Sequence, residues 1–328
     1  MIAFVFPGQG AQRVGMGRAL AERYPQAREV FERADDALGF SISRLCFEGP
    51  EEELRLTANS QPAILAVSMA AHEVVRRELG VRPQVVAGHS LGEYSALVAA
   101  GALTLEDAVK LVHQRGRFMQ EAVAPGQGGM AAVMGLSDTA VAELCREAAG
   151  DEVLAPANFN GGGQVVIAGH AGAVERGMAL AKARGARAIP LKVSAPFHCP
   201  LMQPAAERLR VALAEVAVHP LRVPVVSNVE AEPNQERGRV VELLATQVTA
   251  PVRWEQSVQR LAALGVAWVL ELGPGKVLSG LIRRVCPELA VDAVESPEQL
   301  EALREQRSAG LGEAAGGRRE WAAEPSAS

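Results

Sequence analysis

Short apolar runs alternate with amphipathic segments along most of the chain. Buried strands are predicted at 2–6, 84–87 and 267–271. Between the first two strands, apolar residues recur at helical spacing, namely Ile64, Leu65, Val67, Ala71, Val74, Val75 and Leu79. This stripe predicts a helix that has Ser60 as its N-cap and ends at Gly80. Alternation of strands and helices is typical of an α/β fold with a parallel sheet.

The middle of the chain follows a different order. After the glycine-rich stretch 126–129, the pattern predicts a strand, helix, strand, strand, helix and strand at 130–134, 137–149, 152–159, 164–168, 171–184 and 186–191. The turn 161–163 makes a hairpin of the second and third strands. This βαββαβ order is typical of a ferredoxin-like domain.

The chain then returns to the first pattern. Helices are predicted at 104–123 before the middle segment and at 201–216, 239–248 and 253–264 after it, with strands at 223–226 and 290–294. We therefore expect a large α/β-hydrolase-like domain with a parallel sheet, made of residues 1–124 and 196–300. The smaller ferredoxin-like domain, 125–195, is inserted into it, with a cleft between the two. Residues 301–328 contain few core-forming residues and are expected to be a disordered tail.

Composition narrows the functional classes. The chain of 328 residues is 48% hydrophobic and carries a net charge of −5, which argues against a nucleic-acid-binding protein. Its four cysteines, Cys46, Cys145, Cys199 and Cys286, have no metal-type or paired spacing, so free thiols in a reducing compartment are expected. The N-terminus lacks a secretory signal pattern, and no apolar run reaches the roughly 18 residues that span a membrane. These features predict a cytoplasmic protein without membrane contact.

The sequence Gly88-His-Ser90-Leu-Gly92 has the G-x-S-x-G pattern of a nucleophile elbow. A predicted strand precedes it and an Ala-rich helical segment, 95–100, follows. A sharp turn of this kind lifts the serine hydroxyl clear of the sheet, and the helix N-terminus behind it favours a developing oxyanion. Ser90 is the candidate nucleophile.

A serine nucleophile needs a base, and six histidines are available. His198 is the candidate because it lies in a loop between Pro196 and Pro200, directly after the inserted domain and beside the expected cleft. His89 is expected to be a packed support residue. Cys199 is a rival nucleophile, although adjacent residues of an extended loop face opposite ways.

No Asp or Glu occupies a convincing position as the third member of a triad. A backbone carbonyl could orient the imidazole instead. Two interpretations of Arg115 stay open: a solvated residue on a helix face, or a two-pronged clamp for a substrate carboxylate. The loop 7–10 could in principle cradle phosphate, but it lacks the Walker Lys-Ser/Thr and the G-x-G-x-x-G spacing.

Five motifs occur in the order and approximate spacing of the malonyl-CoA:acyl carrier protein transacylases, and the chain resembles that family over residues 1–295. They are Phe6-Pro-Gly-Gln-Gly10, Gly88-His-Ser-Leu-Gly-Glu93, Gln114-Arg115-Gly116, Pro196-Phe-His198 and Gly273-Pro-Gly-Lys276. The resemblance implies a ping-pong acyl transfer that uses no cofactor or metal and supplies the extender unit for fatty acid synthesis. Malonyl-CoA would be the donor and acyl carrier protein the partner, and the chain is expected to act as a monomer.

The resemblance also assigns roles. It implies that Ser90 takes the malonyl group as an ester, that His198 is its base and that Arg115 binds the malonyl carboxylate. The backbone N–H groups of Gln9 and Leu91 would form the oxyanion hole, and the backbone carbonyl of Gln247 would hold the histidine. The matches further imply that Gln61, Asn160 and the stretch 161–163 line the cleft, and that Leu91 and Phe197 favour malonyl over methyl-branched substrates.

The sequence leaves open where the carrier protein docks and whether one of two rival functions applies instead. Acyl carrier proteins are acidic, so a basic patch should receive them. The candidate groups are Arg184, Arg187 and Lys192, or Lys276, Arg283 and Arg284. A thioesterase with water as acceptor, and a non-catalytic acyl-binding domain, are the rival functions.

Overall fold

The computed structural model describes residues 1–313, with side chains described as far as residue 306. It contains two sheets. The larger sheet has the strand order β10-β9-β1-β2-β7-β8. Its strands are β1 (Ile2–Phe6), β2 (Val85–Gly88), β7 (Val225–Val226), β8 (Pro233–Asn234), β9 (Trp268–Leu272) and β10 (Ala290–Val294). All pair in parallel except β7 with β8.

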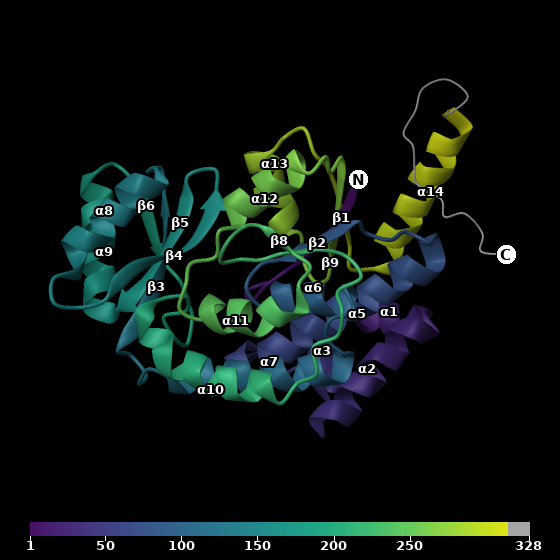
Figure 1. The fold of residues 1–328 in the computed structure, drawn as a ribbon, viewed down its shortest axis with the longest axis horizontal. Coiled ribbons are helices and arrows are strands. Elements are labelled where there is room, and N and C mark those ends of the chain that lie inside the picture. The colour runs from purple at the N-terminus through teal and green to yellow at the C-terminus, as the bar shows by residue number, and fades with distance from the viewer. Residues whose placement is uncertain (314–328) are drawn as a thin grey trace.

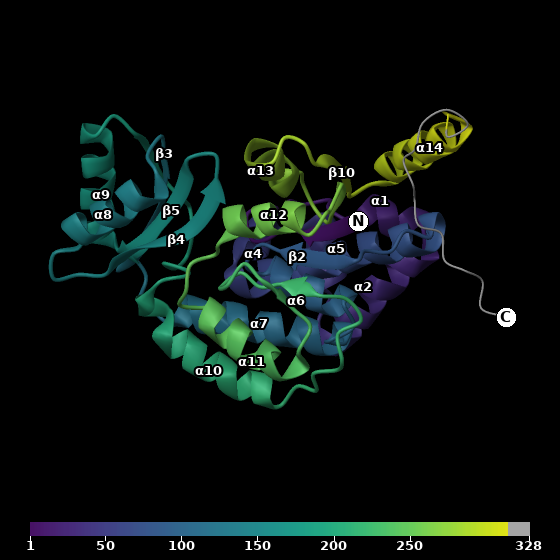
Figure 2. The same cartoon turned by 45° about the horizontal axis from the view of Figure 1, so that its top comes forward.

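Helices cover both faces of this sheet, as Figures 1 and 2 show. Phe4 and Phe6 of β1 face one core, while Ala3 and Val5 face the other, as the two-residue period of a strand requires. The first core is shared with α1 (Arg18–Arg23), α2 (Pro25–Leu38), α3 (Ile42–Glu48), α4 (Glu51–Arg55), α5 (Thr57–Leu79), α6 (Gly92–Ala99), α7 (Leu105–Glu121), α10 (Gln203–Ala214) and α11 (Arg237–Gln247). The second is shared with α12 (Trp254–Ala263) and α13 (Val277–Val285).

The smaller sheet is antiparallel, with the order β4-β5-β3-β6. It consists of β3 (Gly128–Met134), β4 (Leu154–Gly161), β5 (Gln164–His170) and β6 (Arg187–Pro190), and α8 (Asp138–Ala149) and α9 (Ala171–Ala183) share its separate core. In chain order this is 2-3-1-4, the arrangement of a ferredoxin-like sheet. The predicted fold class is confirmed.

Backbone contacts join the two sheets through β4. Val252, just before α12, accepts a hydrogen bond from the Phe159 N–H and donates one to the Ala157 carbonyl, both at 2.9 Å. At the hairpin tip, a Cβ on Gly161 would lie 2.2 Å from Val285 of α13. The small sheet, at the left in Figure 1, therefore contacts the main body through its edge strand and turn, and one of its faces also adds residues of β3 and β5 to the main core, namely Met130, Ala132, Val166 and Ala168.

Two predicted helix boundaries were wrong. The helix expected from Ser60 begins at Thr57, and Ser60 is buried inside its first turn. Pro62 lies within this helix and cannot donate to the Ala58 carbonyl. The Nδ1 of His113 contacts that carbonyl at 2.8 Å instead, so a tertiary contact lets the helix extend in front of its proline. The helix expected over 201–216 is a 3₁₀ turn, Pro200–Met202, followed by α10.

The prediction of a disordered tail from residue 301 was also wrong for residues 301–313. Helix α14 runs over Pro297–Glu313 and extends outward at the upper right of Figure 1. Leu300 is completely buried and Leu303 is 4% exposed in the main core, so burial of two leucines on one helix face stabilises the segment. Residues 314–328, the rest of the expected tail, lie outside the described residues. Within the described part of the chain, no helix is long and apolar enough to cross a membrane.

Candidate active site

Ser90 lies in the tight turn between β2 and α6. Its φ of 52° is in the left-handed region that side chains rarely adopt. The flanking glycines are required by space, because a Cβ on Gly88 would lie 2.0 Å from the Gly92 backbone, and one on Gly92 would lie 2.0 Å from the Phe6 carbonyl oxygen. The Ser90 N–H donates to Oδ1 of Asn228 at 2.6 Å. The turn is a nucleophile elbow held in a strained conformation.

His198 faces Ser90 across the site. Its Nε2 lies 2.7 Å from the Ser90 Oγ, and its Nδ1 lies 2.8 Å from the carbonyl oxygen of Gln247. Because a carbonyl can only accept, Nδ1 carries the proton and Nε2 is free to receive the serine proton. Burial, and next the charge of Arg115, lower the pKa of His198 to about 3, so the ring is neutral near pH 7.

Cys199 does not share this geometry. Its thiol is buried and donates to the Pro196 carbonyl at 3.1 Å. Burial raises the pKa of the thiol to about 11, which keeps it protonated. His198 has a φ of 58°, so the loop is not extended there as expected, yet within the described residues the thiol makes no hydrogen bond to Ser90 or His198.

Arg115 reaches the same point from α7. It is 1% exposed, so the interpretation as a solvated residue is wrong. Its Nη1 donates to Gln61 Oε1 at 2.7 Å, and its Nη2 donates to Ser90 Oγ at 3.1 Å and to Gln247 Oε1 at 2.9 Å. The next residue, Gly116, lets α7 approach α5, because a Cβ there would lie 2.5 Å from the Thr57 carbonyl oxygen. The result is a buried cation beside the serine hydroxyl. The three side chains that accept these hydrogen bonds are all uncharged.

Neither the Leu91 N–H nor the Gln9 N–H has an acceptor within residues 1–313. Their neighbours are engaged, since the Gly92 N–H donates to the His89 carbonyl and the Gly10 N–H donates to Gln12. The Gln9 side chain donates to Thr57 Oγ1 at 3.1 Å, which anchors its loop against α5. Of the residues assigned to selectivity, Leu91 is fully buried and Phe197, directly before His198, is 7% exposed.

Asn160 contacts the elbow through His89. The His89 Nε2 lies 2.9 Å from Asn160 Oδ1, and the His89 ring packs 5.7 Å from that of Trp254. Burial lowers the pKa of His89. His89 thus supports the elbow from the side of the small sheet, as expected of it. The stretch 161–163 forms the β4–β5 turn, which packs against Val285 and Arg284 of α13.

Two residues of this network were missed by sequence reasoning. Glu93 is 3% exposed, and its Oε2 accepts from the Asn228 N–H at 3.1 Å and from Gln247 Nε2 at 2.7 Å. Burial raises the pKa of Glu93 to about 7. Asn228 also donates from Nδ2 to the Gly88 carbonyl at 2.7 Å. Two sequence features could have identified them. Glu93 lies inside the elbow motif, and Asn228 follows a parallel strand that pairs with β2.

The described residues hold no cluster of His, Cys, Asp and Glu side chains that could bind a metal ion. The basic candidates for partner docking are exposed on the surface. Arg184 pairs with Glu147, and Arg283 donates to the Val291 carbonyl at 2.6 Å.

Comparisons with known proteins agree with this geometry. Residues 3–303 match the family described as the acyl transferase domain. The chain is 49% identical over 305 residues to the malonyl CoA-acyl carrier protein transacylase of Salmonella typhimurium, covering 93% of this chain and 99% of that protein. It is also 49% identical over 302 residues to the transacylase of the same name from Bacillus subtilis strain 168, covering 92% and 95%.

Solved structures match equally well. An acyl carrier protein S-malonyltransferase from Vibrio cholerae aligns with a TM-score of 0.89 and 46% identity over 92% of this chain and 99% of that one. A malonyl-transacylase solved in complex with its type II PKS acyl-carrier protein aligns with a TM-score of 0.91 and 44% identity over 93% and 99%. From the family match, the sequence identity and the shared fold, we conclude that this chain belongs to the acyl transferase domain family.

Proposed function

We propose that this chain transfers the malonyl group of malonyl-CoA to the pantetheine thiol of acyl carrier protein, and so supplies the extender unit for fatty acid synthesis. One observation carries the proposal: a buried cation, Arg115, lies 3.1 Å from the hydroxyl of a serine that is paired with a neutral histidine. A guanidinium in this place suits an acyl group that ends in a carboxylate. The names of the relatives point to the same activity.

In the first half-reaction, Ser90 Oγ attacks the thioester carbonyl while His198 Nε2 takes the serine proton. The bond from Oγ to the acyl carbon forms, the bond from that carbon to sulfur breaks, and the proton passes from His198 to the CoA thiolate. The Gln247 carbonyl stabilises the imidazolium through Nδ1–H. The N–H groups of Gln9 and Leu91 receive the oxyanion, consistent with their lack of any acceptor in the described chain.

In the second half-reaction, the carrier-protein thiol gives its proton to His198 and its sulfur attacks the malonyl ester. The acyl–sulfur bond forms, the ester bond to Ser90 breaks, and His198 returns the proton to Ser90 Oγ, which restores the serine and the neutral base. Every group used in this mechanism comes from one chain, so we propose that the protein acts as a monomer and without a cofactor. We also propose that it acts in the cytoplasm. Residues 1–124 with 196–300, and 125–195, form the two sides of the cleft. Exposed basic residues such as Lys276 or Lys192 would receive the acidic carrier.

The experiment is intact-protein mass spectrometry after brief incubation with malonyl-CoA, comparing the native chain with Ser90→Ala. We expect a malonyl-sized mass increase that requires Ser90 and disappears when thiol-bearing carrier protein is added. Free malonate without transfer would instead identify a thioesterase. If neither an adduct nor turnover is observed, the result would favour a non-catalytic acyl-binding domain.

A further inference from the structure

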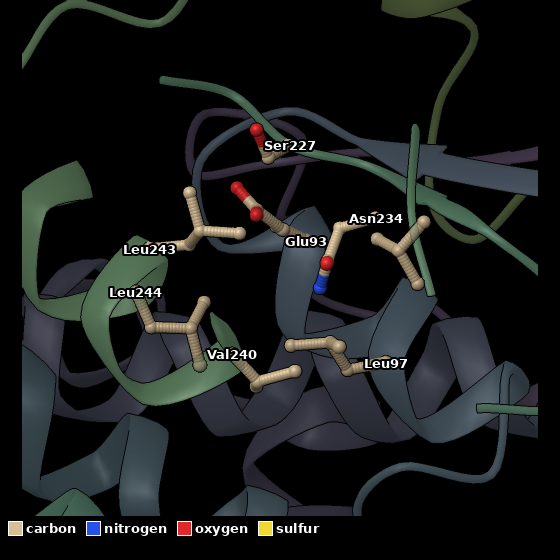
Figure 3. Close-up of a pocket in the computed structure, with 8 residues that line it drawn as sticks. Glu93, Leu97, Ser227, Asn234, Val240, Leu243 and Leu244 are labelled. Atoms are coloured by element: carbon tan, nitrogen blue, oxygen red, sulfur yellow. The ribbon is translucent and has the colours of Figure 1, made fainter. Parts of the chain in front are cut away.

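Glu93 is a buried carboxylate that the proposed mechanism does not use. It lies in the first turn of α6, one residue beyond the elbow. In Figure 3 its side chain borders a small cavity whose other lining residues include Leu243, Leu244 and Ser227. The cavity measures about 10 Å³, which is room for a single water at most. No substrate can reach the carboxylate from this side, so any role of Glu93 acts through its protein neighbours.

Those neighbours lead to the reacting groups along two routes. The first runs through the Gln247 side chain, whose Nε2 donates to Glu93 at 2.7 Å and to the Ser90 carbonyl at 3.0 Å. The Oε1 of the same amide accepts from Arg115 at 2.9 Å. The second runs through Asn228, whose N–H donates to Glu93 and whose Oδ1 accepts from the Ser90 N–H.

The side-chain amide of Gln247 could present either its oxygen or its NH₂ group to Arg115, and the contact with Glu93 favours the oxygen. With its NH₂ held by two acceptors, the Gln247 amide must present its oxygen to the guanidinium. In the opposite orientation the NH₂ would face Arg115, placing donor against donor and leaving a buried N–H without an acceptor. Arg115 would then keep the Gln61 and Ser90 bonds but lose the one that spans to α11.

We propose that Glu93 is a positioning residue for recognition of the substrate carboxylate: it fixes the orientation of the Gln247 amide and, through that amide, the place of the Arg115 guanidinium. The inference rests on the proposed malonyl transfer. It predicts that loss of the Glu93 acceptor harms transfer of a carboxylate-bearing acyl group more than transfer of a neutral one. Acetyl makes no use of Arg115 and serves as the neutral comparison.

The test compares Glu93→Met and Glu93→Gln, with the kcat/KM of malonyl and acetyl transfer from CoA to carrier protein measured for each. Both variants keep a side chain of similar length, but only the glutamine retains an acceptor oxygen. We expect the malonyl/acetyl ratio to fall roughly tenfold in Glu93→Met, the scale of one lost charge-assisted hydrogen bond. In Glu93→Gln the ratio should stay within about twofold of native, since the acceptor is restored.

A purely structural role would lower both activities together and leave the ratio unchanged. An unchanged ratio in folded Glu93→Met, or an equal fall in Glu93→Gln, would overturn the proposal. Ser227→Ala is the matched control, because Ser227 lines the same cavity and makes no hydrogen bond to Gln247 or Arg115 within the described residues. We expect it to leave the ratio at the native value.

If Glu93→Met does not fold, Glu93→Asp takes its place. The shorter side chain keeps the charge but withdraws the oxygen from Gln247, so the ratio should again fall; a native ratio would count against the proposal. Combining either variant with Gln247→Met should then produce no further change in the ratio, because both remove the same relay. Additive changes would refute the relay. The native chain is assayed first: absence of malonyl transfer there would reject the proposed function, whereas failure of the variants alone would reject only the role of Glu93.

Discussion

At the scale of single residues, the site holds one serine hydroxyl between a neutral base and a permanent cation. His198 and Arg115 both contact the Ser90 Oγ, at 2.7 and 3.1 Å. The charge of Arg115 contributes to the low pKa of His198. A substrate carboxylate that neutralises this charge would therefore raise the basicity of His198 at the moment it is needed. Recognition and base strength are linked through one side chain.

Arg115→Ala should therefore lower malonyl transfer about a hundredfold, since the malonyl carboxylate would be left without its charge-assisted pair. Acetyl transfer should fall much less, because it does not need the clamp and His198 would become more basic. The measurement is kcat/KM for both acyl groups. Arg117→Ala, two residues along the same helix with a side chain that is 55% exposed, is the matched control. An unchanged malonyl/acetyl ratio in Arg115→Ala would remove the clamp assignment.

The pH dependence separates His198 from Glu93. An acceptor of protons works in its neutral form, and with a pKa near 3 His198 stays neutral from pH 5 to 8. An inflection at the ordinary histidine value of about 6.5 is therefore not expected. Burial raises the pKa of Glu93 to about 7, so this carboxyl gains a proton as the pH falls through that value. Its carbonyl oxygen can still accept from Gln247, as the amide oxygen of Glu93→Gln does, so malonyl acylation should decline by no more than about twofold there.

The check is the rate of adduct formation between pH 5 and 8 in the native chain and in Glu93→Gln. Any such small decline near pH 7 should be absent in the variant, because Glu93 is the group that titrates. Other charged or titratable groups near this carboxyl are Arg115 and Tyr94, and the pKa of Tyr94 is raised to about 12 by burial, so neither changes charge in this range. An inflection that survives in the variant would assign the titration to another group.

At the scale of elements, the elbow depends on how closely β1, β2 and α6 approach one another. Gly92 allows the start of α6 to lie against the end of β1, and Gly88 allows the turn to close. Both could be identified from the G-x-S-x-G pattern. The reason for Gly8 could not, because the backbone that its Cβ would meet, the His89 carbonyl at 2.4 Å, is distant in sequence.

Gly92→Ala should destabilise the chain by on the order of 3 kcal/mol or more, because the overlap is with backbone that cannot rotate away. Thermal or urea unfolding measures the change. Gly238→Ala in α11 is the control, since no atom lies within 4 Å of its Cβ and alanine favours the helix by up to about 1 kcal/mol. Equal stability of the two variants would show that the elbow tolerates a wider turn than the structure indicates.

At the scale of the whole molecule, the small sheet is attached to the main body by β4, by its hairpin turn and by an apolar face that packs into the main core. Asn160, which contacts the elbow through His89, lies in this attached strand. One connection from the small sheet to the nucleophile elbow therefore runs through the hydrogen bond between Asn160 and His89. Loosening the attachment should affect the site as well as stability.

Gly161→Ala tests this attachment, and Gly185→Ala is its matched control. Both glycines have left-handed φ values, 85° and 80°, so alanine adds similar strain of about 1–2 kcal/mol at each. Only Gly161 faces a neighbour, Val285 at 2.2 Å from the added Cβ, whereas Gly185 has open space. We expect Gly161→Ala to lose stability and kcat/KM well beyond the control. Matching losses would mean that the contact with α13 contributes nothing beyond backbone strain.

The sequence by itself determined the fold class, most of the strands and helices, and the candidate residues Ser90, His198 and Arg115, because hydrophobic period, turn residues and motif spacing are local properties of the chain. Tertiary structure decided what joins them. Only the fold shows that Arg115 is buried, that the Gln247 carbonyl contacts His198, and that Glu93 accepts from the Gln247 amide, since the last two contacts connect residues 49 and 154 positions apart. The same reason explains α14, where a composition typical of a tail forms a helix because Leu300 and Leu303 find a distant core to pack against. Local sequence carries periodicity, whereas the partner of a buried polar group is set by which surfaces the fold brings together.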